Sequence, residues 1–263
     1  TLVQENLYAL SAMDKNNIAY NMPTVLMLKG QLDIEVLKLA YEKLVIRHES
    51  FRTSCHTIGN EIVQKINEYD QSTLFNFEYK SLGNKDLKAE LLESIKPFRL
   101  DTPPLIKVKL IQLKSDSYAL FIDMHHIISD GISVNHFIDE FFELYNGNGL
   151  VDLKPYEIQH RDYSEWQKTL YGKSFMVERE KYWLEKFEDF QELNLPYDYV
   201  KTNKQRFDGE VVELEFSGEL GKKIKEVAKS NRCTPNAILL SAYYVLLSKY
   251  SQQQEIILGT AVN

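Results

Sequence analysis

Two adjacent histidines, followed closely by an aspartate and a glycine, form the stretch of this sequence best suited to chemistry. They lie in residues 125–131, which read HHIISDG. A histidine whose pKa lies near neutrality can accept or donate a proton at physiological pH. A glycine permits backbone shapes that other residues resist. The pattern predicts a site for acid–base chemistry, with two structural histidines beside a turn as the plainer alternative.

Other chemistries fit these residues less well. Successive side chains of a strand point to opposite faces of a sheet, so His125 and His126 are poorly placed to bind one metal ion. No third ligand has a telling spacing, and the Gly-x-Ser-x-Gly pattern of a serine nucleophile is absent. Cys55 and Cys233 form neither a metal-type spacing nor a disulfide framework. We therefore expect no metal site.

The elements on either side of the histidines decide how they are positioned. Residues 118–126 are largely apolar on both faces, which predicts a central strand that is covered on both sides. Residues 134–145 carry apolar side chains at close to a 3.6-residue period, which predicts a helix, with Ser133 as its N-cap. The first turn of this helix offers free backbone N–H groups beside the histidines.

The rest of the chain interleaves strands and helices, which predicts an α/β fold in two halves that meet between residues 150 and 195. The predicted strands are 25–28, 51–55, 62–66, 105–113, 210–216 and 256–259. The predicted helices are 33–45, with Asp33 as N-cap, and 84–95, 162–172, 176–189, 219–229 and 235–250. Residues 194–208 are expected to form a crossing loop.

Composition excludes several classes of protein. The 263 residues include 31 Lys and Arg against 38 Asp and Glu, a formal net charge of −7 without a dense basic cluster, which disfavours nucleic-acid binding. No run approaches the roughly 20 apolar residues of a membrane-spanning helix, and the first residues lack the pattern of a secretory signal. Two cysteines suit a reducing compartment. We expect a cytoplasmic protein without a membrane or nucleic-acid partner.

Four segments resemble, in the right order, the motifs of one enzyme family. HHIISDG resembles the His-His-x-x-x-Asp-Gly signature of nonribosomal peptide synthetase condensation domains and of the wider chloramphenicol-acetyltransferase-like acyltransferases. Residues 47–53 (RHESFRT) resemble the family's Arg-His-Glu-x-Leu-Arg-Thr, with Phe51 replacing Leu. Residues 160–167 (HRDYSEWQ) resemble its Tyr-x-Asp-Tyr-Ala-x-Trp-Gln, and residues 1–10 resemble a drifted first motif.

The resemblance implies a chloramphenicol-acetyltransferase-like mixed sheet flanked by helices, as one lobe of a two-lobe pseudodimer plus part of the second. Residues 1–175 would form the N-terminal lobe, which carries the histidine motif. Residues 176–263 would begin the C-terminal lobe, which this chain does not complete. The active site of the family lies in a tunnel between the two lobes.

The resemblance also implies the reaction and its partners. A donor acyl or peptidyl thioester and an acceptor aminoacyl thioester would be joined by an amide bond. Both would arrive on 4'-phosphopantetheine arms of peptidyl carrier domains, while this chain itself would bind no cofactor. Its neighbours would be other synthetase domains such as an adenylation domain, and it would work as a monomeric unit of a larger chain in antibiotic biosynthesis.

By resemblance, His126 faces the tunnel as general base or as a group that positions the amine. The backbone N–H of Gly131 is a candidate contact to the substrate or to an oxyanion. His125 would pack on the opposite face and hold the loop by a hydrogen bond.

Two arginines and one aspartate are expected to be structural. Asp130 would pair with an arginine of residues 47–53, and Arg52 is favoured over Arg47. Loss of one partner of a buried pair is strongly destabilising. The remaining candidates His48 and His136 are expected to serve packing or surface contacts.

Two alternatives stay open beside peptide-bond formation. One is an acyltransferase of the same superfamily that uses acyl-CoA, and the other is a non-catalytic docking or scaffold domain. Residues 47–53 and 160–167 favour the synthetase over the first alternative, and the intact histidine motif argues against the second. Residues 133–135 (SVN) differ from the pattern of epimerization relatives, which favours condensation.

Overall fold

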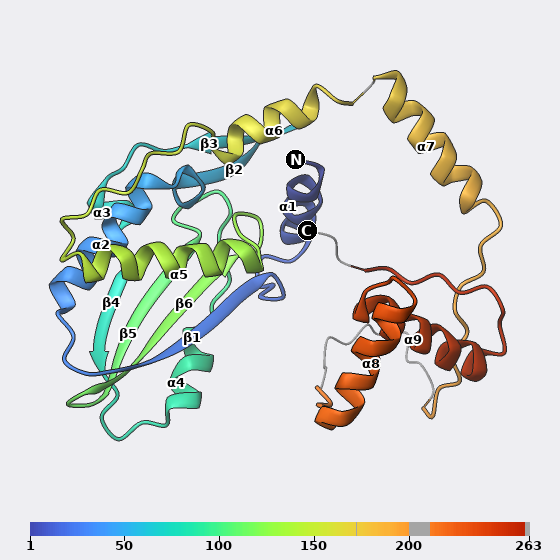
Figure 1. The fold of residues 1–263 in the computed structure, drawn as a ribbon. Helices are drawn as coiled ribbons and strands as arrows, with labels where there is room; N and C mark the ends of the chain where they lie inside the picture. The colour runs from blue at the N-terminus through green and yellow to red at the C-terminus, as the bar shows by residue number, and fades with distance from the viewer. Residues whose placement is uncertain (172, 200–210, 261–263) are drawn as a thin grey trace. The chain divides into compact units, whose positions relative to one another are not determined.

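The computed structural model describes residues 1–171, 173–199 and 211–260 of the chain (Figure 1). The chain forms two compact units, Thr1–Lys173 and Ser174–Asn263. Within the described residues, all strands belong to the first unit. The histidine motif therefore lies in the unit that carries the sheet.

The first unit alternates helices and strands along the chain. Its elements are α1 (Leu2–Met13), β1 (Asn21–Lys29), α2 (Ile34–Arg47), the 3-10 helix η1 (Glu49–Arg52), β2 (Thr53–Ile58), β3 (Glu61–Ile66), α3 (Gln71–Leu74), β4 (Phe77–Ser81), α4 (Leu87–Ser94), β5 (Ile106–Lys114), β6 (Ser117–His125), α5 (Gly131–Asn146) and α6 (His160–Lys168). The second unit contains α7 (Ser174–Lys186), α8 (Gly218–Ser230) and α9 (Pro235–Ser251).

The main sheet has the strand order β1-β6-β5-β4. Strand β6 runs antiparallel to both neighbours, and β4 runs parallel to β5. Every residue of β6 after Ser117 is buried, which confirms the predicted central strand with two covered faces. A second, two-stranded sheet pairs β2 with β3 as the predicted hairpin, with Gly59 at a positive φ of 62° in its turn.

Helices α2 and α5 cover one face of the main sheet, as Figure 1 shows. Leu120 and Ile122 of β6 pack into the same core cluster as Tyr41 of α2 and Phe141 of α5, and all are at most 1% exposed. Full burial of one such side chain stabilises a fold by about 1.5–3 kcal/mol. This core fixes α5, and so the first turn of α5, against the end of β6.

The opposite face of the sheet carries a polar network to α4. Lys109 of β5 lies between two core residues in the strand, so its side chain points away from α2 and α5. Its Nζ lies 2.8 Å from Ser94 Oγ and 3.4 Å from the buried carboxylate of Glu90. The network anchors α4 to the sheet on the face away from the core.

The predicted local signals are confirmed in several places. The Asp33 carboxylate caps α2 by accepting hydrogen bonds from the backbone N–H groups of Glu35 and Val36. Most strands and helices of the first unit overlap the predicted ranges, although α1, α3 and β4 were not predicted and residues 51–52 belong to η1 and not to a strand. The predicted helices of the second unit are also present as α7, α8 and α9.

Two predicted strands of the second unit are wrong. Residues 211–216 and 256–259 have no strand structure, while Glu210 and part of the predicted 194–208 loop lie outside the described residues. A strand is stabilised by hydrogen bonds to a neighbour. In the part of the chain that the structure describes, neither segment pairs with a strand. A strand-like pattern of apolar residues in the sequence was therefore not sufficient to form a sheet.

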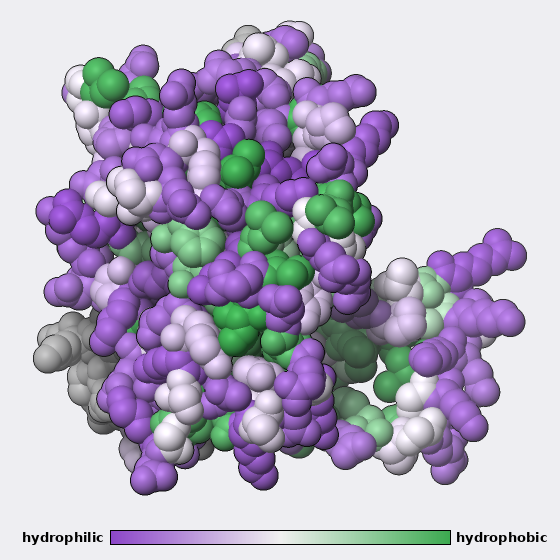
Figure 2. Space-filling model, turned by 90° about the vertical axis from the view of Figure 1, so that its left-hand side faces the viewer, coloured by the Kyte–Doolittle hydropathy of each residue, from purple (hydrophilic) through white to green (hydrophobic). Residues whose placement is uncertain are grey.

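The face shown in Figure 2 is mostly hydrophilic, with hydrophobic side chains in small groups, as is usual for a folded protein. None of the helices in the described ranges is long and apolar enough to cross a membrane.

Candidate active site

His125, the last residue of β6, is a buried and neutral histidine. Its side chain lies near the rings of Tyr20 and Phe98, with centroid distances of 6.3 and 6.0 Å. Burial, assisted by the neighbouring His126, lowers the pKa of His125 to about 4. Its Nδ1 accepts a hydrogen bond from the backbone N–H of Ile127 at 3.0 Å, which places the ring proton on Nε2. The loop-holding hydrogen bond expected of His125 is present.

His126 follows directly and has the opposite environment. Its residue is exposed, whereas His125 is 3% exposed. Its backbone N–H donates to the carbonyl of Tyr20 at 2.8 Å, just before β1 begins. The backbone of His126 is therefore anchored to the residue that precedes β1, while the residue itself is exposed.

The turn after the histidines is held from two sides. The Ile128 N–H and the Ser129 hydroxyl both donate to the carbonyl of His125, each at 3.1 Å. From α1, the side-chain amide of Gln4 donates to the carbonyl of Ile127 at 2.8 Å. These bonds hold in place the residues directly after His126.

Asp130 is the N-cap of α5, so the predicted cap Ser133 is wrong. The Asp130 carboxylate accepts hydrogen bonds from the Ser133 N–H at 2.8 Å and from the Ser133 hydroxyl at 2.6 Å. These bonds lower the pKa of Asp130. Ser133 lies at the third helical position, which is where an N-cap finds its donor.

Gly131 opens α5 directly behind the cap. Within the described residues, its backbone N–H has no hydrogen-bond acceptor, as is usual in the first turn of a helix. A Cβ added at Gly131 would meet no atom within 4 Å. The N–H of Gly131 is thus available to an acceptor from outside the chain.

The predicted ion pair between Asp130 and Arg52 is wrong, because the structure gives both groups other partners. The Arg52 guanidinium donates to the carbonyls of Val45, Ile46 and Asn67, at 3.1, 3.2 and 2.6 Å. Val45 and Ile46 lie in the last turn of α2, whose carbonyls lack partners within the helix and attract cations. Arg52 therefore closes α2 and does not reach the histidine loop.

The alternative partner Arg47 also lies away from Asp130, at Glu140 of α5. Glu140 is 8% exposed and its carboxylate contacts Arg47 Nε at 3.1 Å, His48 Nε2 at 2.6 Å and the Tyr156 hydroxyl at 2.8 Å. Burial alone would raise the pKa of Glu140, but hydrogen bonds from His48 and Tyr156 lower it overall. Burial lowers the pKa of His48.

Sequence reasoning missed Glu140, although the signal was present. It lies three residues after Phe137 and one before Phe141, on the buried stripe of the helix. A carboxylate on such a stripe requires partners from elsewhere in the fold.

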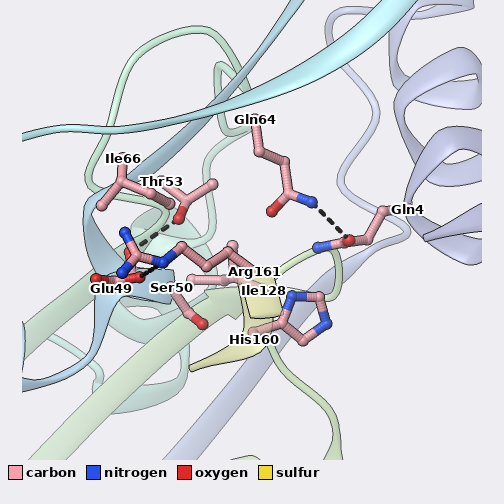
Figure 3. A pocket seen from close by; sticks show the side chains of 9 residues that line it. All are labelled: Gln4, Glu49, Ser50, Thr53, Gln64, Ile66, Ile128, His160 and Arg161. Atoms are coloured by element: carbon pink, nitrogen blue, oxygen red, sulfur yellow. Dashed lines mark hydrogen bonds and ion pairs between the residues drawn. The ribbon is translucent and has the colours of Figure 1, made fainter. Parts of the chain in front are cut away.

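Two hollows bring the four motif segments together. The first, shown in Figure 3, is lined by Gln4, Glu49, Ser50, Thr53, Gln64, Ile66, Ile128, His160 and Arg161. There the Arg161 guanidinium points to the Glu49 carboxylate at 3.2 Å, and the Gln64 amide donates to Gln4 at 3.1 Å. The second is a cavity of about 250 Å³ that shares Ser50, Ile128 and His160 with the first. His126 itself lines neither hollow.

Metal ligands are not gathered in the described ranges. No group of three or more His, Cys, Asp or Glu side chains there is placed to hold a metal ion.

Comparison with known proteins gives matches along the whole chain. A family model described as "Condensation domain" matches residues 1–263. Bacitracin synthase 2 of Bacillus licheniformis is 37% identical over 260 residues, which are 98% of this chain and 10% of that protein. Gramicidin S synthase 2 of Brevibacillus brevis is 38% identical over 260 residues, which are 98% of this chain and 6% of that protein. The chain thus spans a small part of these relatives.

Solved structures share the fold. The first condensation domain of the calcium-dependent antibiotic synthetase, in complex with a substrate analogue, aligns with a TM-score of 0.74 and 17% identity over 96% of this chain and 61% of that chain. The X-domain from teicoplanin biosynthesis aligns with a TM-score of 0.80 and 21% identity over 92% of this chain and 55% of that chain. The predicted mixed sheet with flanking helices is confirmed by these likenesses.

Proposed function

The chain belongs to the condensation domain family, and we propose that it forms an amide bond between two carrier-bound groups. The amine of the acceptor attacks the carbonyl of the donor thioester, the donor C–S bond breaks, and the donor's phosphopantetheine arm leaves as a thiol with the proton that the amine loses. The donor is an acyl or peptidyl thioester and the acceptor an aminoacyl thioester. One observation carries the proposal: an accessible imidazole, His126, lies on an anchored backbone next to a helix start whose first N–H, at Gly131, has no acceptor within the described residues.

Each of the two groups has a role in this reaction. The His126 imidazole accepts a proton from the attacking amine or holds the amine in place. The Gly131 N–H donates to the oxygen that becomes negative in the tetrahedral intermediate. Asp130 and His125 act through the backbone, since they fix the helix start and the loop.

Typical magnitudes indicate that positioning of the two substrates contributes more to the rate than proton transfer by His126. General acid–base catalysis typically contributes about 10²–10⁴-fold in rate. Holding two reactants in a productive geometry can remove about 7–11 kcal/mol from the barrier. A domain that brings two tethered substrates together is suited to the second effect.

We further propose the partners that this reaction requires. They are a donor and an acceptor peptidyl carrier domain, each with a 4'-phosphopantetheine arm, and neighbouring synthetase domains such as an adenylation domain. The relatives are synthases of which this chain covers 10% and 6%, which supports a place within a larger chain. Two free cysteines, Cys55 and Cys233, suit the reducing cytoplasm.

The test is a condensation assay on the complete synthetase that contains this chain, with loaded donor and acceptor carriers, read by intact-protein mass spectrometry. His126→Ala is expected to lower turnover by about 100-fold or more while the protein stays folded. Gly131→Pro removes the backbone N–H of this residue and is expected to lower turnover without loss of the fold, because proline is well tolerated at the first position of a helix. Gly218→Pro, at the first position of α8 and with equally open space, is the matched control and should leave turnover unchanged.

The other outcomes separate the alternatives. Unchanged turnover in a folded His126→Ala protein would remove the role of His126. Carrier binding without turnover in the wild type would favour a docking domain. Transfer from acyl-CoA to a free amine or alcohol would favour an acyltransferase.

A further inference from the structure

The backbone directly after His126 is held by the side chain of a buried glutamine. Gln4 of α1 is 9% exposed, and its Nε2 donates to the carbonyl oxygen of Ile127 at 2.8 Å. The N–H of the same peptide group, at Ile128, donates to the carbonyl of His125 at 3.1 Å. This peptide is therefore fixed at both of its polar ends, and loss of the Gln4 bond would release one of them.

A second glutamine decides which way the Gln4 amide faces. Gln64 of β3 donates from its Nε2 to Gln4 Oε1 at 3.1 Å, and the Thr1 hydroxyl donates to the same oxygen at 3.2 Å. An amide side chain carries its acceptor oxygen and its donor nitrogen on different sides of one carbon. Because both neighbours are donors, the oxygen of Gln4 faces them and its NH2 group faces Ile127. Figure 3 shows the Gln64 amide pointing at that of Gln4.

The two glutamines connect segments that are far apart in the sequence. Gln64 and Gln4 are separated by 60 residues, and Gln4 and Ile127 by 123 residues. Gln64 lies outside the four motif segments, so the motifs did not identify it. A displacement of about 1 Å in a reacting group can lower a rate by about 100-fold. The hydrogen bonds from Gln64 to Gln4 and on to Ile127 are therefore close enough to His126 to affect turnover.

We propose that Gln64 and Gln4 are positioning residues for the candidate catalytic group His126. Gln64 sets the orientation of the Gln4 amide, and Gln4 holds the backbone directly after His126. Neither glutamine touches the reacting atoms. This inference rests on the proposed function, because it concerns the turnover to which His126 contributes.

Two charged variants of Gln64 should have different effects in the complete synthetase. Gln64→Lys keeps a donor towards Gln4 Oε1, so kcat should stay within about threefold of the wild type. Gln64→Glu offers only acceptors and draws the NH2 group of Gln4 away from Ile127, so kcat should fall by about 10-fold or more. KM for the loaded carriers should be unchanged in both variants. A merely structural role of Gln64 would not separate donors from acceptors.

Variants of Gln4 supply a pH signature. Gln4→Met removes the donor and should lower kcat by about 10-fold or more at every pH. Gln4→Glu introduces a carboxyl that donates to Ile127 only when it is protonated, and burial raises the pKa of a carboxyl. The ratio of its kcat to that of the wild type should therefore rise as the pH falls from about 8 to about 6. The corresponding ratio for Gln4→Met should stay constant.

Asn67 provides the matched control. It directly follows β3, and its Nδ2 also donates to a backbone carbonyl, that of Arg52, at 2.9 Å. Its further bonds go to Ser54 Oγ and to the carbonyl of Lys65, so they stay within the hairpin and its ends. Asn67→Leu should therefore lower the stability of the hairpin and leave kcat unchanged.

Hydrogen exchange on the 263-residue chain tests the loop without the reaction. Gln4→Met and Gln64→Glu should speed the exchange of the Ile128 amide by about 10-fold or more, measured by NMR. The amide of Leu120, in the middle of β6, should keep its wild-type rate in both. Asn67→Leu should leave the rate of Ile128 unchanged.

The outcomes keep this inference apart from the proposed function. If the wild-type synthetase does not condense its loaded carriers, the proposed function fails. Faster exchange of Ile128 in the glutamine variants would then still support their hold on the loop, and unchanged exchange would overturn it. If the wild type condenses and Gln64→Lys and Gln64→Glu have equal kcat, the positioning role is overturned. A pH-independent ratio for Gln4→Glu would also overturn it.

Discussion

At the residue scale, the two adjacent histidines of the motif have different environments and different roles. His125 completes a buried strand, where desolvation keeps it neutral and its Nδ1 holds the next turn. His126, one position later, is exposed and keeps its imidazole for a ligand. The difference follows from alternation at a strand end, because neighbouring side chains point to opposite faces.

The lowered pKa of His125 predicts a pH dependence of stability. An unfolded histidine has a pKa of about 6.5, whereas burial lowers the pKa of His125 in the fold to about 4. Folding thus favours the neutral form, so this contribution is complete above pH 6.5 and is lost as pH falls towards 4. We expect His125→Asn to weaken the decline of the free energy of unfolding between pH 7 and pH 4.5, measured by urea denaturation.

The control for this prediction is a neighbouring residue that does not titrate. Ser129→Ala removes the hydrogen bond from the Ser129 hydroxyl to the carbonyl of His125 and should keep the wild-type slope. Equal slopes for His125→Asn and the wild type would contradict the buried, neutral state of His125.

At the element scale, the helix start and the helix end near the site are closed by different polar groups. Asp130 caps the start of α5, and Arg52 closes the end of α2 through the carbonyls of Val45 and Ile46. Glu140 then ties the two helices together through Arg47 and His48. The site is therefore framed by two helix caps and one long-range cluster around Glu140, and not by one ion pair between Asp130 and Arg52.

A double-mutant cycle tests this arrangement. Asp130→Ala should lower the free energy of unfolding by about 1 kcal/mol, the usual effect of losing an N-cap. Combined with Arg52→Ala, the two effects should add to within about 0.5 kcal/mol, because the side chains share no partner. The measurement is chemical denaturation of the wild type, both single variants and the double variant.

Asp130→Ser provides the control, because serine also caps helices well. It should retain most of the stability that Asp130→Ala loses. A coupling energy well above the additive limit would show that Asp130 and Arg52 do interact.

At the scale of the whole molecule, the two units differ in how much apolar surface they bury. The first unit contains both core clusters, including the fully buried Leu110 and Leu120. In the described residues of the second unit, only Ala228 and Leu247 are buried. Large side chains such as Trp183 are left exposed. Stability should therefore be concentrated in the first unit.

Hydrogen exchange can measure this difference. Helices α5 and α9 have 16 and 17 residues, so they form a matched pair from the two units. Amides in the middle of α9 should exchange at least about 100-fold faster than those of α5, because local opening of α9 exposes little additional apolar surface. The measurement is hydrogen–deuterium exchange with mass spectrometry on the 263-residue chain. Equal protection would mean that the apolar face of α9 is covered in solution.

The local features of the fold could be predicted from the order of the amino acids. The period of the apolar residues located α2 and α9 within a few residues, and Asp33 was identified as the cap of α2. The apolar residues from Tyr118 onward placed the histidines at the end of a buried strand. The motifs pointed to the condensation domain family. Helix period, cap residues and strand ends depend on residues that are close together in the sequence, so they can be predicted without knowledge of the fold.

The pairing of distant polar groups could not be predicted in this way, because it depends on how the helices and strands pack. Glu140 finds Arg47 and His48 from 93 and 92 residues away, and no local pattern specifies such a pair. The Arg52 guanidinium bonds to helix carbonyls that lie only six and seven residues away in the sequence, whereas Asp130 is much more distant along the chain. Residues 211–216 alternate as a strand but have no strand partner in the described chain. Long-range pairing depends on the packed core, because the packing of the helices and strands decides which polar groups lie next to one another.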